Sequence, residues 1–140
     1  MTIIRNIINH LTENPKTLFI IDGLGAMLTA ILLLVVVRNF NEYFGMPKTI
    51  LTYLSAIAAC FAIFSTSCFL LVKQNRLPFI RSISYANLLY CILILILLIM
   101  YCYQLTIMGI IYFIVEIIII SVLAYIELNV ATAIKKKIIY

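Results

Sequence analysis

The sequence predicts an all-α membrane protein: an antiparallel bundle of four transmembrane helices, preceded by a short amphipathic helix at the membrane interface. Of the 140 residues, 66% are hydrophobic and only 11% are charged, whereas a soluble domain carries roughly 25% charged residues. Four apolar runs are each long enough to cross the roughly 30 Å hydrocarbon core of a bilayer as a helix. The connections between the runs are short, so consecutive helices are expected to be antiparallel neighbours.

The first residues predict a short helix at about residues 3–12. Its apolar residues fall on one helical face, with polar residues opposite; they are Ile3, Ile4, Ile7, Ile8 and Leu11. A helix of this kind lies in the plane of the membrane surface. The alternative is a disordered apolar segment, because the stretch is short for an isolated helix.

The four predicted spans cover residues 18–37, 49–72, 79–101 and 105–128, and residues 129–140 form a basic tail. Runs such as LILILLIM are too continuous for the alternating strands of a transmembrane barrel. Too little sequence remains outside the spans for a soluble domain, so we expect one membrane domain over residues 1–140. The same composition excludes a disordered protein, a nucleic-acid-binding module and an ordinary soluble enzyme.

The basic residues predict the orientation, because Lys and Arg near span ends favour the cytoplasmic side. With four spans, both termini and the second loop share one side, which carries eight basic residues: Arg5, Lys16, Lys73, Arg76, Arg81, Lys135, Lys136 and Lys137. The opposite side carries only Arg38 and Lys48. We therefore expect a plasma (inner) membrane protein with both termini in the cytoplasm. Lys135, Lys136 and Lys137 are expected to contact anionic lipid headgroups.

Three acidic residues, Asp22, Glu116 and Glu127, lie within the predicted spans, and no Lys or Arg lies deep in any span. An ionised acid in hydrocarbon costs about 2.5–3.5 kcal/mol on insertion scales, so such residues are functional candidates by default. Glu116 and Glu127 are 11 residues apart, which places both on one face of a helix. Asp22 shares a stripe of small residues with Ala26 and Ala30, a pattern that favours close helix contact.

Depth and spacing together predict a polar pocket in the cytoplasmic half of the bundle. Asp22, Ser67, Asn87 and Glu127 are expected to build it, with Glu116 as its floor. Ser67 is assigned to this pocket on a face shared with Ala56, Cys60 and Phe64, and Asn87 on a face shared with Ser84, Cys91, Ile94 and Leu98. Ser84, Tyr90 and Tyr112 are secondary candidates, and the two tyrosines are placed to hydrogen-bond an acid.

Three functions are compatible with this pocket. Three acids without basic partners are not all ionised cheaply, so at least one holds a proton or the group binds a cation. The first hypothesis is proton- or cation-coupled carriage of a small cationic or polar solute. The second is a membrane-embedded enzyme that uses paired carboxyls as general acid and base on a lipid-soluble substrate. The third is a structural subunit or scaffold whose acids hydrogen-bond between helices.

Other chemistry has little support in the sequence. The four cysteines form no CxxC pair, and His10 is the only histidine, which argues against thiol redox chemistry, a haem and a His-rich metal site. We therefore expect no metal, no cofactor and no nucleic-acid partner. The expected partner is the lipid bilayer, and the sequence leaves open a homodimer or a complex with another membrane protein.

Two short motifs carry a resemblance to known sequences. They are IDGLGA at residues 21–26, in the first span, and FGMPK at residues 44–48, just before the second. With these motifs the chain resembles a group of uncharacterised bacterial four-span membrane proteins. The resemblance covers most of the chain and implies the four-span fold, but it carries no activity and assigns no site residue.

Overall fold

The computed structural model describes residues 1–140, and all of its regular structure is helical. Four helical segments are long and apolar enough to cross a membrane. They are α2 (Pro15–Ile31) with its continuation η1 (Leu32–Val37), α4 (Lys48–Leu71), α5 (Leu77–Met100) and α6 (Ile107–Ile139). Two short helices complete the fold, α1 (Thr2–Glu13) and α3 (Asn41–Phe44). The predicted all-α fold with four spanning helices is confirmed.

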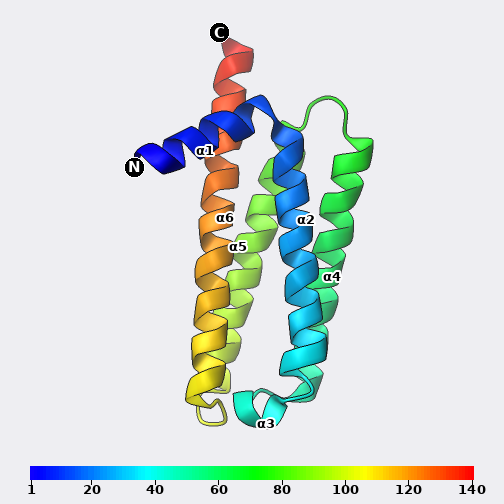
Figure 1. Ribbon diagram of the computed structural model, residues 1–140, viewed down its shortest axis with the longest axis vertical. Coiled ribbons are helices and arrows are strands. Elements are labelled where there is room, and N and C mark those ends of the chain that lie inside the picture. The colour runs from blue at the N-terminus through cyan, green and yellow to red at the C-terminus, as the bar shows by residue number, and fades with distance from the viewer.

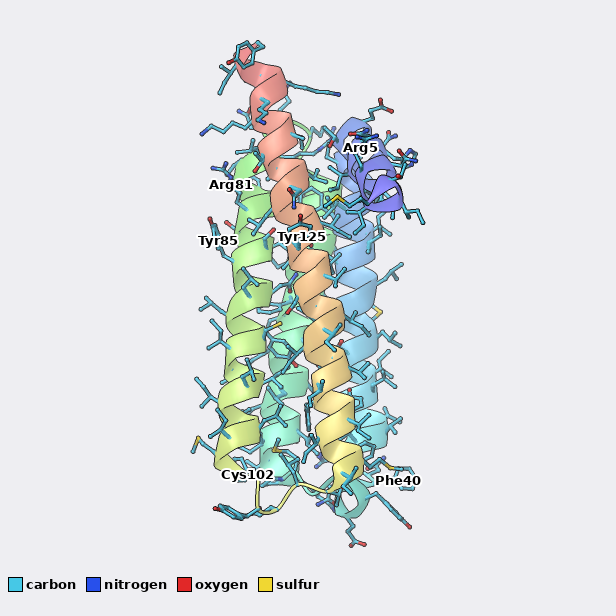
Figure 2. The ribbon with its side chains drawn as sticks, turned by 90° about the vertical axis from the view of Figure 1, so that its left-hand side faces the viewer. Arg5, Phe40, Arg81, Tyr85, Cys102 and Tyr125 are labelled. Atoms are coloured by element: carbon cyan, nitrogen blue, oxygen red, sulfur yellow. The ribbon has the colours of Figure 1, made fainter.

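The spanning helices run side by side, and both chain termini lie at one end of the bundle (Figure 1). We call this the terminal end, and it also holds α1. The opposite, distal end holds α3 and the connection between α5 and α6. Figure 2 shows Arg5 and Arg81 at the terminal end and Phe40 and Cys102 at the distal end. The closest packing joins α2 to α4 and α5 to α6, so the bundle consists of two α-hairpins.

Local sequence signals explain where these helices begin. Pro15 and Pro78 lie in the first turns of α2 and α5, where the missing N–H costs nothing. Pro47 lies just before α4 with an extended backbone. Thr106 caps α6, because its hydroxyl accepts a hydrogen bond of 3.1 Å from the Gly109 N–H.

The last six residues of the first span form a π-helix, η1. Its wider turn is visible in the hydrogen bond of 2.9 Å from the Arg38 N–H to the Leu33 carbonyl, five residues earlier. Leu33 and Val37 are both fully buried against the core. Nothing in the uniform apolar run of residues 32–37 predicts this change of helix type.

The fourth helix is longer than its predicted span of 105–128. α6 continues without a break to Ile139 and includes the predicted basic tail. No Gly or Pro follows Leu128, so no residue stops the helix. At 33 residues, α6 is about 50 Å long, which exceeds the roughly 30 Å of a hydrocarbon core.

The N-terminal segment is a helix, so the alternative of a disordered segment is wrong. Its apolar face is divided between two environments. Leu11 is buried against Leu18 and Val130, whereas Ile3 and Ile7 stay exposed. α1 crosses α6 at the terminal end (Figure 1). Its location at a membrane interface stays a prediction.

The distal end is held by close backbone contacts. Gly45 ends α3 with a left-handed backbone, φ +80°, and a Cβ atom there would collide with the backbone of Gln104 and Leu105. A Cβ atom at Gly109 would collide with the Phe44 carbonyl. The Thr106 N–H also donates to the Phe44 carbonyl at 3.2 Å. Glycine is therefore required on both sides of the contact between α3 and α6.

Two buried apolar clusters occupy the two ends of the bundle. The larger, distal cluster contains Leu33, Val37, Met46, Leu51, Leu54, Tyr90, Ile94, Leu105 and Phe113. The smaller, terminal cluster contains Phe19, Cys68, Ile80, Ile83 and Ala131. Large apolar side chains on the outer faces of all four spans are exposed, as expected for helices that lipid surrounds.

Candidate functional site

Each of the four spans contributes one polar side chain to a buried group between the two apolar clusters. These side chains are Asp22 from α2, Ser65 from α4, Asn87 from α5 and Glu127 from α6, and we call them the polar cluster. Glu127 and Ser65 are 0% exposed, and Asn87, the most exposed of the four, only 6%. The group therefore lies where the two hairpins meet.

The hydrogen bonds of the polar cluster converge on Asp22 and Asn87. The Ser65 hydroxyl donates to Asp22 Oδ2. The Asn87 side-chain amide donates to Asp22 Oδ1 at 2.8 Å and, at a longer 3.4 Å, to Glu127 Oε2. One amide thus links carboxyl groups from two different hairpins. A buried polar group without such a partner costs several kcal/mol in hydrocarbon, so these bonds favour one arrangement of the hairpins.

Glu127 is only partly satisfied. Its Oε1 atom is buried and has no hydrogen-bond partner in the protein. Ser84 is also fully buried, but its hydroxyl donates to the Ile80 carbonyl of its own helix at 2.9 Å. No Lys or Arg lies among these residues. The cluster therefore keeps a free carboxyl oxygen that can accept a proton or a cation.

The sequence prediction named Ser67 where the structure places Ser65. Ser67 is half-buried and forms no hydrogen bond with the cluster, so its assignment to the pocket is corrected. The predicted face of α4 was wrong as a whole, since Ala56, Cys60 and Phe64 are exposed. Helix α4 instead buries Ser55, Ala58, Ala62 and Ser65. On the predicted face of α5, Ser84, Asn87, Cys91 and Ile94 are buried and Leu98 is half-buried; on α6, Glu116 and Glu127 are both buried.

A sequence signal for Ser65 did exist. Ala58, Ala62 and Ser65 form a stripe of small residues at helical spacing, which favours close contact between helices. The matching stripe on α2 contains Asp22 and Gly23, and a Cβ atom added to Gly23 would lie 3.5 Å from the Ser65 side chain. Two small-residue stripes in consecutive spans therefore indicated the packed face of α4.

Glu116 is not the floor of the polar cluster. It lies three turns along α6 from Glu127, is 8% exposed, and accepts a hydrogen bond of 3.3 Å from the Tyr90 hydroxyl through Oε1. Its Oε2 atom is buried without a partner. Tyr112, half-buried one turn earlier, packs edge-on against Phe44 and Phe113. The prediction of one pocket with five residues is therefore replaced by two acidic positions.

Two neighbouring cavities connect these positions. A lateral groove of about 330 Å³ lies between α2 and α6 and is lined by Glu116 and Tyr112. An inner cavity of about 60 Å³, large enough for water, is lined by residues of all four spans, including Asp22, Asn87 and Tyr90. Both are lined by Gly25, Thr29, Ile119 and Ile120. The polar cluster and Glu116 are therefore reached from the same side of the bundle.

The apolar clusters separate the polar groups from the two ends of the bundle. On α5, Ile80 and Ile83 precede Asn87 in the terminal cluster, and Tyr90 and Ile94 follow it in the distal cluster. The lateral groove instead opens where α2 and α6 make few contacts. The groove wall on α2 includes Gly25, and no atom lies within 4 Å of a Cβ added at this position. The accessible route to the acids is therefore sideways.

No protein-family model, curated protein or solved structure matches this chain. The fold and the four apolar helices define a small multi-pass helical membrane protein. Its distinguishing feature is a group of buried acids at the interface between two hairpins.

Proposed function

We propose that this protein carries a small cationic or polar solute across the plasma membrane in exchange for protons. The observation that carries the proposal is the pair of buried, unpartnered carboxyl oxygens, Glu116 Oε2 and Glu127 Oε1, in a bundle core without a basic residue. Intramembrane acids that face a cavity commonly form proton or ion pathways. A purely structural hydrogen-bond network has no need of free carboxyl oxygens.

In this mechanism the solute enters through the lateral groove. Glu116 in the groove wall gives up its proton and holds the cation, and the solute then moves past Gly25 and Thr29 to the inner cavity. Asp22 binds it there, and Asn87, which lines the same cavity, connects this position to Glu127 behind it. Release on the other side returns one proton to Glu116, the acid that gave one up, so each monovalent cation exchanges for one proton.

Purified protein in liposomes tests this proposal. The small, permanently charged cation tetramethylammonium is added outside vesicles that contain a pH-sensitive dye, and proton release from the vesicles is recorded. We expect a solute-driven proton flux that the substitutions Glu116→Gln and Glu127→Gln each abolish. Flux equal to that of empty liposomes, across a panel that also includes ethidium and K⁺, contradicts the proposal.

A matched control distinguishes the loss of an intramembrane acid from the loss of any negative charge. Glu42 lies on α3, outside the spans, and is exposed. The variant Glu42→Gln removes the same charge and is expected to keep full flux. If Glu116→Gln and Glu127→Gln lose only thermal stability, and the wild-type protein also gives no flux, the scaffold hypothesis takes the place of the carrier.

A second candidate is a membrane-embedded enzyme. The observation that favours it is the shared amide, because Asn87 contacts one carboxyl oxygen of Asp22 and one of Glu127. Paired carboxyls can divide the roles of general acid and base. This hypothesis expects a lipid-like molecule to stay bound after mild extraction, which native mass spectrometry detects; a uniformly empty protein contradicts it.

We further propose that both termini face the cytoplasm. The support is the excess of Lys and Arg at the terminal end described above. A reporter that is active only in the cytoplasm, fused after Tyr140, is expected to be active. The same reporter inserted in the distal connection, near Tyr103, is expected to be silent, and the reverse pattern overturns the orientation.

A further inference from the structure

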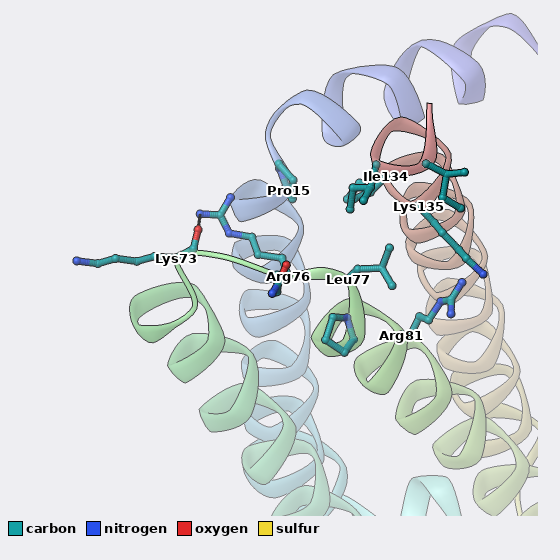
Figure 3. Close-up of a pocket in the computed structure, with 11 residues that line it drawn as sticks. Pro15, Lys73, Arg76, Leu77, Arg81, Ile134 and Lys135 are labelled. Carbon is teal, nitrogen blue, oxygen red and sulfur yellow. Dashed lines mark hydrogen bonds between the residues drawn. The ribbon is translucent and has the colours of Figure 1, made fainter.

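A second cavity, unrelated to the acids, lies at the terminal end of the bundle. It measures about 610 Å³ and is bordered by Pro15, the connection between α4 and α5, the first turns of α5 and the last turns of α6. Four basic residues line it, Lys73, Arg76, Arg81 and Lys135, and no acidic residue does. Figure 3 shows that Arg81 and Lys135 extend toward each other, that the Arg76 guanidinium turns toward the Lys73 carbonyl, and that the Lys73 side chain extends outward. The wall of the cavity is therefore positively charged, and no acidic residue of the protein neutralises it.

The cations come from separate segments of the chain and are held differently. The Arg76 guanidinium donates to the carbonyls of Val72 and Lys73, both at 3.2 Å, which anchors it at the end of α4. Arg81 from α5 and Lys135 from α6 extend toward the same side of the cavity (Figure 3). Two cations brought together by different helices repel each other unless an anion lies between them.

Apart from Asn75, the remaining lining of the cavity is apolar. Leu77 on α5 and Ile134, Ile138 and Ile139 on α6 complete the wall. Ile138 and Ile139 are 70% and 64% exposed, so they are free to contact a further molecule. The first turn of α5 also borders the cavity, and a helix N-terminus attracts anions. A ligand that suits this site carries a negatively charged group that the four basic side chains can neutralise.

We propose that this cavity binds the phosphate headgroup of an anionic phospholipid. The place in the fold agrees with this ligand, since the cavity lies where α5 begins and where α6 extends beyond the other spans. This site is more specific than the contact with anionic headgroups that the sequence predicts for Lys135, Lys136 and Lys137. Of these three lysines, only Lys135 lines the cavity.

The test measures lipid binding by native mass spectrometry, because the chain has no Trp whose fluorescence could report binding. Purified full-length protein is titrated with phosphatidylglycerol or phosphatidylcholine. We expect one tightly bound phosphatidylglycerol per chain and no comparable phosphatidylcholine. The variant Arg81→Gln/Lys135→Gln is expected to bind phosphatidylglycerol at least about tenfold more weakly, because each basic residue near a membrane surface contributes about 1 kcal/mol.

The matched control is Lys136→Gln/Lys137→Gln, which removes the same charge from exposed side chains outside the cavity. It is expected to change the affinity less than twofold. A second pocket variant, Lys73→Gln/Lys135→Gln, changes only exposed side chains and is also expected to weaken binding, so a folding defect of the first does not decide the result.

Three results overturn the proposal. Equal losses in pocket and control variants indicate diffuse attraction to anionic lipid, and equal binding of both lipids indicates no headgroup recognition. Displacement of the lipid by inorganic phosphate at millimolar concentration indicates a site for soluble phosphate instead. Because none of these variants alters an intramembrane acid, proton flux and lipid binding succeed or fail independently.

Discussion

The two halves of the bundle hold their helices together by different means. The distal half contains the large apolar cluster and the close approach of α3 to α6 at Gly45 and Gly109. The terminal half contains the polar cluster, in which Asn87 connects the hairpins through Asp22 and Glu127. Lipid is as apolar as Leu, so apolar burial by itself does not hold spanning helices together. Specific association therefore rests on backbone contact in one half and on hydrogen bonds in the other.

The largest expected effect tests the distal half. The substitution Gly45→Ala places a Cβ on a left-handed backbone, which costs about 1–2 kcal/mol, and forces it into the backbone of Gln104. Together we expect a loss of about 3 kcal/mol in the free energy of unfolding, measured by titration with sodium dodecyl sulfate in mixed micelles.

The control for this variant lies beside the polar cluster. Gly25→Ala adds the same methyl group in helical geometry where no atom lies within 4 Å, so stability is expected to change by less than about 1 kcal/mol and in the favourable direction. Equal destabilisation by the two alanines would break the comparison, because close packing would then not be confined to the distal end.

The next effect tests the terminal half. Asn87→Leu removes the amide that reaches both carboxyl groups at nearly constant volume. Hydrogen bonds between membrane helices average about 0.6 kcal/mol and reach about 1.7 kcal/mol, so we expect a loss of about 1–2 kcal/mol in the same titration. Thr132→Ala is the control, because that hydroxyl donates only to the Leu128 carbonyl of its own helix, and less than about 0.5 kcal/mol is expected. Equal losses of stability for the two variants would show that the Asn87 amide does not stabilise the contact between the hairpins.

The smallest effect separates the two acidic positions. Tyr90→Phe deletes only the hydroxyl that donates to Glu116 at 3.3 Å, a long distance for an O–H donor. We expect a loss of about 0.5 kcal/mol, with the apolar contacts of the ring retained. A loss as large as that of Asn87→Leu would show that Glu116 belongs to the same cooperative network as Glu127.

Helical periodicity predicted the position of the acids on α6, but it did not predict which face of α4 joins the site. The shared face of Glu116 and Glu127 follows from their spacing alone, and both are buried. The face of α4 does not follow from hydropathy, because Ser65, Thr66 and Ser67 are consecutive and point in different directions; only the stripe of small residues indicated the packed side. The choice of Ser65 over Ser67 came from contact with Asp22 and Gly23 of the neighbouring helix.

The sequence by itself determined the number of spans, the polar residues inside them and the asymmetry of basic charge. Each of these depends on the transfer of single segments between water and lipid, which is a local property. Only the tertiary structure decided that Asn87 lies between Asp22 and Glu127, that Glu116 borders a separate groove, and that Lys73, Arg76, Arg81 and Lys135 surround one cavity. These groups form between distant segments, and their positions depend on how the two hairpins pack.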